Sequence, residues 1–228
     1  MSSVHPHAIW PILKGYGVRE LALRIPGVSF LLRSLPGSGY NSFSVFMPGS
    51  RYALVTYVRN PVGEFVENLR RELHPPMPHL PAHLTILPPR DLQASEATAL
   101  ELLEEECSRV IPFDLELGDV ETFLPTTPTV FIQVARFAYR MRDLHDQLNL
   151  KALCGIESWR YIPHLTIVKT EQDEQALEAF TVARERWARF QGLRQVHVRE
   201  LMFVRENGDC WQDVASVQLG RSQLSSKL

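Results

Sequence analysis

A four-residue motif, His-Leu-Thr-Ile, occurs twice in the chain, at residues 83–86 and again at residues 164–167. Each copy is a short apolar run that follows a proline closely, which is typical of a β-strand. Side chains of a strand alternate between two faces, so His83 and Thr85 share one face and the aliphatic residues share the other. Each copy therefore predicts an imidazole and a hydroxyl side by side on a strand that is backed by hydrophobic core.

The elements around the two copies follow a similar order. Hydrophobic periodicity predicts strands at 51–58, 82–87, 113–123, 129–135, 163–169, 193–205 and 211–219, and helices at 61–73, 95–110, 137–153 and 174–190. The order of strands and helices is approximately duplicated, with one histidine strand in each repeat. We therefore expect an α+β fold with two lobes and pseudo-twofold symmetry. Each lobe would be a mostly antiparallel sheet with outer helices, and the histidine strands would face each other across a central cleft.

The first fifty residues differ from the rest of the chain. They contain turn-rich Pro-Gly and Gly-Ser clusters, yet they are too apolar for a disordered tail. We interpret residues 1–50 as an N-terminal extension that packs on a domain formed by residues 51–219. A short tail, 220–228, ends the chain.

Composition narrows the possible partners. With 45% hydrophobic and 22% charged residues, the chain of 228 residues has the composition of an ordinary globular protein. A net charge of -2 argues against binding to long duplex nucleic acid. Three scattered cysteines predict a reducing compartment, and no apolar run approaches a membrane span. We expect a cytoplasmic monomer without a membrane partner.

Two histidines on opposite sides of a cleft can act together at one phosphorus atom. One neutral imidazole accepts a proton from the attacking hydroxyl or water, while the other, protonated, gives a proton to the leaving oxygen. The hydroxyls of Thr85 and Thr166 can donate hydrogen bonds to the non-bridging oxygens. This chemistry needs neither a metal nor a cofactor. The predicted catalytic residues are therefore His83, Thr85, His164 and Thr166.

The paired motifs, about eighty residues apart, resemble those of the two-histidine (2H) phosphoesterase superfamily. This superfamily includes 2'-5' RNA ligase-like proteins and 2',3'-cyclic nucleotide phosphodiesterases. The resemblance covers about residues 51–217 and implies the same two-lobed fold. It also implies metal-independent cleavage of a 2',3'-cyclic phosphate or a 2'-5' phosphodiester, in an RNA end or a small nucleotide. Two alternatives stay open: reversible 2'-5' RNA ligation, and a non-catalytic module that binds nucleotides or RNA ends.

Three further residues are candidates for substrate binding. Lys169 follows the second motif, at about the distance where the superfamily often has a basic residue, and Arg90 follows the first motif. Either could instead be a solvated surface charge. Tyr161 could stack on a base, or it could pack in the core or between the lobes.

Two other clusters of potential metal ligands have simpler interpretations. His74 and His79 flank prolines but lack a third ligand at zinc-site spacing, so we assign them to a loop. The glutamates at 101 and 104–106 lie opposite the apolar stripe of a predicted helix and form a solvated face. The sequence therefore predicts no metal site.

Overall fold

A computed structural model of the protein describes residues 24–25, 28–29, 50–73, 80–208 and 210–220. The chain divides into two units, Met1–Gly49 and Ser50–Leu228. In the first unit, β1 (Arg24–Ile25) and β2 (Val28–Ser29) form an antiparallel pair. The expected packing of residues 1–50 on the domain lies outside the described residues. The same is true of the loop role of His74 and His79 and of nearly all of the C-terminal tail.

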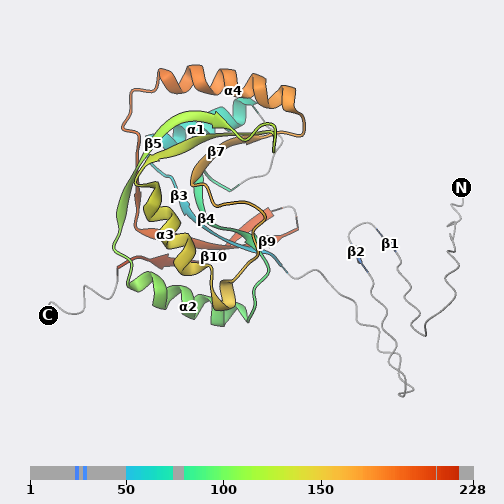
Figure 1. Cartoon of the computed structure of the whole chain (residues 1–228), viewed down its shortest axis with the longest axis vertical. Helices are drawn as coiled ribbons and strands as arrows, with labels where there is room; N and C mark the ends of the chain where they lie inside the picture. Colours follow the sequence, from blue (N-terminus) through green and yellow to red (C-terminus); the bar gives the residue numbers. More distant parts are fainter. Residues whose placement is uncertain (1–23, 26–27, 30–49, 74–79, 209, 221–228) are drawn as a thin grey trace, which may run out of the picture. The chain divides into compact units, whose positions relative to one another are not determined.

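The second unit is built on one antiparallel sheet of eight strands (Figure 1). The strands are β3 (Tyr52–Tyr57), β4 (His83–Arg90), β5 (Phe113–Thr122), β6 (Thr129–Arg136), β7 (His164–Lys169), β8 (Gln195–Val198), β9 (Glu200–Asn207) and β10 (Cys210–Gln218). Their order across the sheet is β10-β9-β3-β4-β7-β6-β5-β8. The α+β class is confirmed, but the expected pair of separate sheets is wrong, because hydrogen bonding continues from one edge strand to the other.

The two histidine strands are the central neighbours of this sheet. β4 and β7 pair at a single position, Leu84 with Leu165, whereas the adjoining strand pairs share four or more positions. The histidine strands thus lie side by side in one sheet instead of facing each other from two sheets. This pairing has the fewest paired positions of any two neighbouring strands in the sheet, and we call it the seam.

Four α-helices and one short 3₁₀ helix accompany the strands in the described part of the chain: α1 (Pro61–Leu73), α2 (Glu96–Ser108), α3 (Ala138–Leu148), η1 (Lys151–Leu153) and α4 (Asp173–Ala188). Helices α1 and α4 contact the half of the sheet that contains β7, while α2 and α3 contact β10 and β4 in the other half (Figure 1). Helix α1 follows β3 but packs on β7, and α3 follows β6 but packs on β4. The two halves are therefore interlocked through their helices.

Helix α1 has the bounds that its sequence predicts. The Asn60 side-chain oxygen accepts hydrogen bonds from the backbone N–H groups of Val62, at 3.1 Å, and Gly63, at 3.3 Å. Pro61 at the first helical position needs no such bond. Val62 and Val66 are completely buried, so this face of the helix packs into the core. On α2, in contrast, Glu101 and Glu104 are exposed, as expected for a solvated face.

The predicted strand 193–205 is two strands, β8 and β9, because the chain turns a corner at Arg199. Strand β8 pairs with β5 at one edge of the sheet, whereas β9, only one residue later, pairs with β3 and β10 near the other edge. The sheet must therefore curl strongly, so that its two edges approach each other. The buried residues have even numbers in β8, at Val196 and Val198, and odd numbers in β9, at Leu201 and Phe203. This change in the alternation of apolar residues is the feature of the sequence that indicates the corner.

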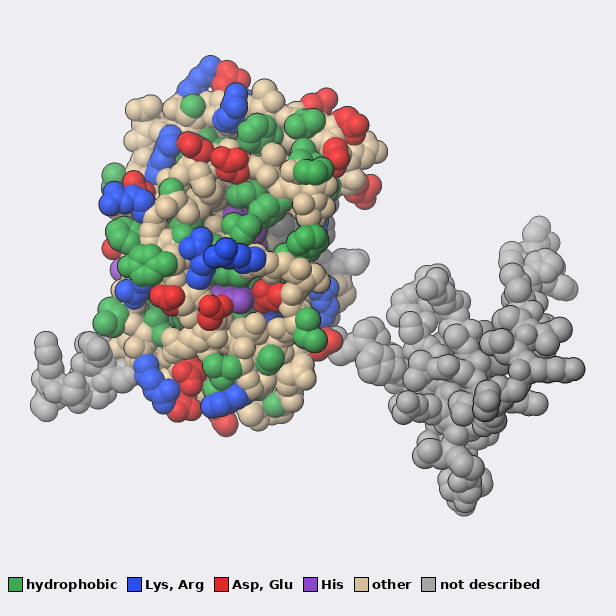
Figure 2. Space-filling model, viewed as in Figure 1, with side chains coloured by type: hydrophobic (Ala, Val, Ile, Leu, Met, Phe, Trp, Pro, Cys, Tyr) green, Lys and Arg blue, Asp and Glu red, His purple; other side chains and the backbone are tan. Residues whose placement is uncertain are grey.

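Charged side chains of both signs are interspersed over the face of the molecule in Figure 2, and no continuous basic surface covers that face. No described helix is long and apolar enough to span a membrane.

Candidate active site

The pairing of Leu84 with Leu165 determines how the two motifs meet. In an antiparallel pair, the residues before and after this position also lie opposite each other. His83 therefore faces Thr166, and Thr85 faces His164. All four side chains project from the sheet face opposite to the two leucines, since strand side chains alternate. The leucines are fully buried and the four polar side chains are half-buried. The fold thus brings the four predicted catalytic residues together, with the two imidazoles on a diagonal.

A register shift follows each threonine. Along β3, Val55 pairs with Thr85 but the next residue, Leu54, pairs with Leu87, and the same shift occurs on β7 just after Thr166. Each motif strand therefore carries one extra residue, a β-bulge, at the same place. Bulges bend a strand and increase its twist, which fits the divergence of β4 from β7 beyond their single pairing.

Both imidazoles are oriented in the same way. The His83 Nδ1 atom lies 2.7 Å from the carbonyl oxygen of Pro81, and the His164 Nδ1 atom lies 2.7 Å from that of Ile162. A carbonyl oxygen only accepts hydrogen bonds, so each Nδ1 carries a hydrogen and donates it. In the neutral ring, Nε2 is then the atom with a lone pair. Among the described residues, neither Nε2 atom has a hydrogen-bond partner.

The environments of the two histidines disfavour their charged forms. Burial lowers the pKa of His83 to about 4, with further lowering by the nearby cation of Arg70 and by His164. Burial also lowers the pKa of His164. The His164 ring meets two aromatic rings at their edges, those of Phe123 and Phe131, with ring centres 5.0 and 5.1 Å away. Although the motifs are identical, His83 lies near the ion pair of Arg70 and Glu67, whereas His164 lies beside two aromatic rings.

The threonine hydroxyls are available for a ligand, whereas the threonine carbonyls are engaged. In the described part of the chain, neither Thr85 Oγ1 nor Thr166 Oγ1 has a hydrogen-bond partner. The Thr85 carbonyl accepts a hydrogen bond from the Tyr161 hydroxyl at 2.6 Å. The Thr166 carbonyl accepts one from Arg70 Nη2 at 2.6 Å. Each motif strand is thus held by a side chain that lies nearer in the sequence to the other motif.

Arg70 was not predicted from the sequence as a residue of this site. It lies on the buried face of α1, only 6% exposed, and is paired with Glu67 at 3.0 Å. Its remaining donors reach the carbonyls of Leu80, at 3.1 Å, and Ile167, at 3.3 Å. A cation beside the apolar stripe of a predicted helix is the sequence signal that could have identified it.

Arg90 has a structural environment instead of the expected place beside a phosphate. It is 8% exposed, and its guanidinium donates to the Pro88 carbonyl, the Asn149 side chain and the Leu153 carbonyl. It also forms an ion pair with Glu157 at 2.5 Å. With these partners, Arg90 is not free for a substrate, and we remove it from the substrate-binding residues.

Tyr161 lies between the two halves of the sheet. Its ring stacks on that of His145, with ring centres 4.2 Å apart and planes 7° from parallel. The Nε2 atom of His145 bonds Glu157 at 2.9 Å, so Tyr161 and Arg90 belong to the same buried network. With one ring face covered and the hydroxyl engaged, Tyr161 supports the motif strand rather than a base. Lys169, in contrast, ends β7 with an exposed side chain.

No group of three or more His, Cys, Asp or Glu side chains among the described residues is arranged to hold a metal ion.

Comparisons with known proteins agree with this architecture. A sequence profile of the 2'-5' RNA ligase superfamily matches residues 58–209. A protein of Halalkalibacterium halodurans named "Putative phosphoesterase" is 23% identical over 173 residues, covering 75% of this chain and 99% of that protein. A protein of the same name from Oceanobacillus iheyensis is 27% identical over 128 residues, covering 54% of this chain and 74% of that protein.

Solved structures share the fold. A crystal structure of a phosphoesterase aligns with a TM-score of 0.50 and 16% identity, covering 75% of this chain and 98% of that one. The structure of E. coli LigT complexed with 3'-AMP aligns with a TM-score of 0.50 and 18% identity over the same fractions. At this identity, the likeness shows a common α+β fold with a curled antiparallel sheet. Together with the profile match over most of the chain, it confirms the resemblance seen in the two motifs: the protein belongs to the 2'-5' RNA ligase superfamily of 2H phosphoesterases.

Proposed function

We propose that the protein is a metal-independent phosphoesterase that cleaves a 2',3'-cyclic phosphate or a 2'-5' phosphodiester, at an RNA end or in a small nucleotide. The observation that carries this proposal is the arrangement of the motif side chains. Two imidazoles with unengaged Nε2 atoms lie diagonally on one sheet face, each facing a threonine across the seam. Such an arrangement suits a phosphate held between an acid and a base.

The unequal surroundings of the histidines suggest their roles. His83, whose pKa is lowered to about 4 by burial and by the nearby Arg70 cation, is neutral near pH 7 and acts as the base. Its Nε2 takes a proton from water as the water oxygen bonds to phosphorus. His164 acts as the acid and gives its Nε2 proton to the ribose oxygen as the bond from that oxygen to phosphorus breaks. The product is a ribose phosphomonoester with one free hydroxyl.

The threonines and Lys169 would stabilise charge on the phosphate. The hydroxyls of Thr85 and Thr166 donate to the non-bridging oxygens, where negative charge increases in the transition state. Lys169 supplies a positive charge at the end of the same strand as His164. These roles use residues that are half-buried or exposed, and therefore accessible to a ligand.

The substrate class is supported by the relatives and by composition. Relatives of this chain carry the name phosphoesterase, and LigT was crystallised with 3'-AMP. The net charge of -2 favours a small nucleotide or a single RNA end over long duplex nucleic acid. Ligation of 2'-5' linked RNA would use the same acid and base in the reverse direction.

A substrate panel tests the proposal. The protein would be incubated with 2',3'-cyclic nucleotides, cyclic-ended oligonucleotides and 2'-5' linked dinucleotides, with products identified by phosphorus NMR. We expect hydrolysis of at least one class, unchanged after exhaustive chelation. Joining of RNA halves without net hydrolysis would favour the ligase. Binding of nucleotides without any turnover would favour a non-catalytic module. Loss of activity on chelation, with recovery after a divalent ion is added, would contradict the metal-independent mechanism.

A further inference from the structure

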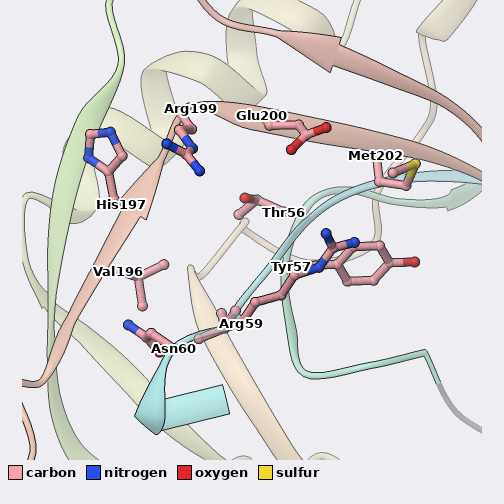
Figure 3. Close-up of a pocket in the computed structure, with 10 residues that line it drawn as sticks. Thr56, Tyr57, Arg59, Asn60, Val196, His197, Arg199, Glu200 and Met202 are labelled. Atoms are coloured by element: carbon pink, nitrogen blue, oxygen red, sulfur yellow. The ribbon is translucent and has the colours of Figure 1, made fainter. Parts of the chain in front are cut away.

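A pocket of about 400 Å³ lies where β3, β8 and β9 meet (Figure 3). The corner at Arg199, between β8 and β9, forms one wall, and the end of β3 with the residues before α1 forms the other. Its charged lining consists of Arg59, Arg199 and Glu200, and His197 and Tyr57 also face it. The volume is within the range of pockets that hold small ligands.

Strand pairing places this pocket next to the proposed catalytic base. Tyr57, which lines the pocket, pairs directly with His83 on the adjacent strand, so the two side chains lie on the same face. Side chains in such a pair are about 5 Å apart at their Cβ atoms. The pairing of β3 with β9 ends at Val55 and Met202, two residues before Tyr57. The strands separate beyond this point, and the pocket occupies the space between them.

The two arginines of the pocket differ from the buried arginines Arg70 and Arg90. Arg59 lies over the Tyr57 ring, with its guanidinium carbon 5.2 Å from the ring centre, whereas Arg199 lies on the opposite wall (Figure 3). Both side chains are exposed, and among the described residues neither guanidinium has a hydrogen bond or an ion pair. The guanidiniums of Arg70 and Arg90, in contrast, are committed to carboxylates and backbone carbonyls. The pocket therefore offers two uncommitted guanidinium groups.

Glu200 and His197, which also line the pocket, already have partners. Glu200 accepts a hydrogen bond from Ser216, and His197 Nδ1 bonds the Asp114 carboxylate at 2.8 Å. Glu200 would repel a phosphate directly beside it, but its carboxylate can accept a hydrogen bond from a ribose hydroxyl. The pocket thus has guanidinium groups on two walls, and the Glu200 carboxylate beside Arg199 is an acceptor.

We propose that this pocket binds a second phosphate group of the substrate, beyond the phosphate that reacts between the histidines. One guanidinium group can donate two parallel hydrogen bonds to the oxygens of a phosphate, and its positive charge favours phosphate over uncharged ligands. The pocket extends from β3, the neighbour of β4, to β9, which lies two strands from β4 and about 10 Å away at the usual strand spacing. A phosphate bound at the β9 wall is therefore distinct from the reacting phosphate. This inference rests on the proposed function and adds a preference: substrates with a second phosphate are cleaved more efficiently than those without.

Two chemical sources could supply that phosphate, and three substrates distinguish them. The first is a nucleoside 2',3'-cyclic phosphate, which has no second phosphate. The second is the same compound with a 5'-phosphomonoester. The third is a cyclic-ended dinucleotide, whose second phosphate is an internucleotide diester. We expect kcat/KM to be about tenfold or more higher for the second or the third compound than for the first, as charge-assisted hydrogen bonds imply.

Variants connect this preference to the pocket. In Arg59→Ala and Arg199→Ala the ratio of kcat/KM values, with and without the second phosphate, should fall by about tenfold for each lost guanidinium. Arg189→Ala is a matched control, because Arg189 is the exposed C-cap residue of α4, does not line the pocket and pairs with Glu185. The control should keep the ratio of the unaltered protein. An unchanged ratio in both pocket variants, or a ratio near one in the unaltered protein, would overturn the inference while leaving the proposed function intact.

A binding measurement keeps the inference testable if no substrate is turned over. Calorimetric titration with a 5'-phosphorylated dinucleotide ending in a 3'-phosphate would be compared with titration of the 3'-phosphorylated nucleoside. Tighter binding of the former, lost in the double variant Arg59→Ala/Arg199→Ala, would support the pocket even if the proposed catalysis failed. Equal binding of both compounds would overturn it.

Discussion

Each motif histidine combines a fixed tautomer with a lowered basicity. A backbone carbonyl two residues earlier accepts the Nδ1 hydrogen of His83 and of His164, so Nε2 is the atom left for proton transfer. Burial lowers the pKa of both rings, but only His83 has Arg70 among the causes. Identical four-residue motifs thus acquire different properties from residues outside the motifs.

Removal of either imidazole should abolish most of the activity. His83→Ala and His164→Ala are each expected to lower kcat by about a hundredfold or more, the usual contribution of a positioned acid or base. Thr85→Ala and Thr166→Ala should lower it less. Thr181→Ala is the control, since this exposed hydroxyl on α4 only bonds the Leu177 carbonyl. Steady-state kinetics and circular dichroism would be measured together. Near-normal kcat in either histidine variant would contradict the paired mechanism.

The pH dependence of kcat/KM should be bell-shaped with its maximum on the acid side of neutrality. Activity requires neutral His83 and protonated His164. It is therefore lost below the lower step, when the base is protonated, and above the upper step, when the acid is deprotonated. The pKa of His83 is about 4 and that of His164 is lowered from its ordinary value of 6.5, so the maximum should lie below pH 6.5.

Arg70→Met provides a directional check on this profile. Removing the cation should raise the pKa of His83 and move the acid limb to higher pH, whereas Arg70→Lys should retain most of the lowering. Histidine NMR titration would measure the same pKa directly. A maximum above neutrality, or an acid limb that does not move in Arg70→Met, would contradict the assignment of His83 as the base.

At the scale of elements, side chains supplement the short backbone pairing at the seam between β4 and β7. Beyond the pair formed by Leu84 and Leu165, the Thr85 carbonyl depends on Tyr161 and the Thr166 carbonyl depends on Arg70. Burial raises the pKa of the Tyr161 hydroxyl, which keeps this group protonated as a donor. Both residues therefore act as positioning residues for the motif strands.

Tyr161→Phe tests this positioning role. Loss of the hydroxyl leaves the Thr85 carbonyl without its donor, which should lower the free energy of unfolding by about 1–3 kcal/mol. Because Thr85 and His83 share a strand, kcat should fall more than KM changes. Tyr139→Phe is the matched control, since Tyr139 is 54% exposed on α3. Denaturant unfolding and steady-state kinetics would be compared. An unchanged kcat with lowered stability would show that the hydroxyl acts on the fold alone.

The elements of the fold were largely predictable because their signals are local. The cap at Asn60 and the apolar spacing after it define α1, and alternation defines the strands of the two motifs. The pairing of Leu84 with Leu165 was not predictable, because it joins residues far apart in the sequence and depends on the curl of the whole sheet. The two motifs were enough to predict that the four motif side chains share one site. For the same reason, however, the sequence did not identify Arg70 as their neighbour or Arg90 as a structural residue.

At the scale of the whole molecule, the lowered pKa values make the stability depend on pH. The unfolded chain binds protons at the ordinary histidine pKa of 6.5, whereas folded His83 binds one only at about 4. The free energy of unfolding should therefore be fully retained above pH 6.5 and decrease as the pH falls towards 4. Urea titrations across this range should give a smaller decrease in His83→Gln, in which the side chain does not titrate. An equal decrease in the variant would show that other groups cause it.

The narrow seam also determines which motions the molecule allows most easily. Two four-stranded halves that share one backbone pairing can separate slightly along that line without breaking any other strand ladder. The gap between the histidines is bounded by the hydrogen bonds of Arg70 and Tyr161 and by helices α1 and α3, each of which packs on the other half. Substitutions at positions 70 and 161 could therefore widen this gap for bulkier leaving groups, while the strand pairing in the rest of the sheet stays unchanged.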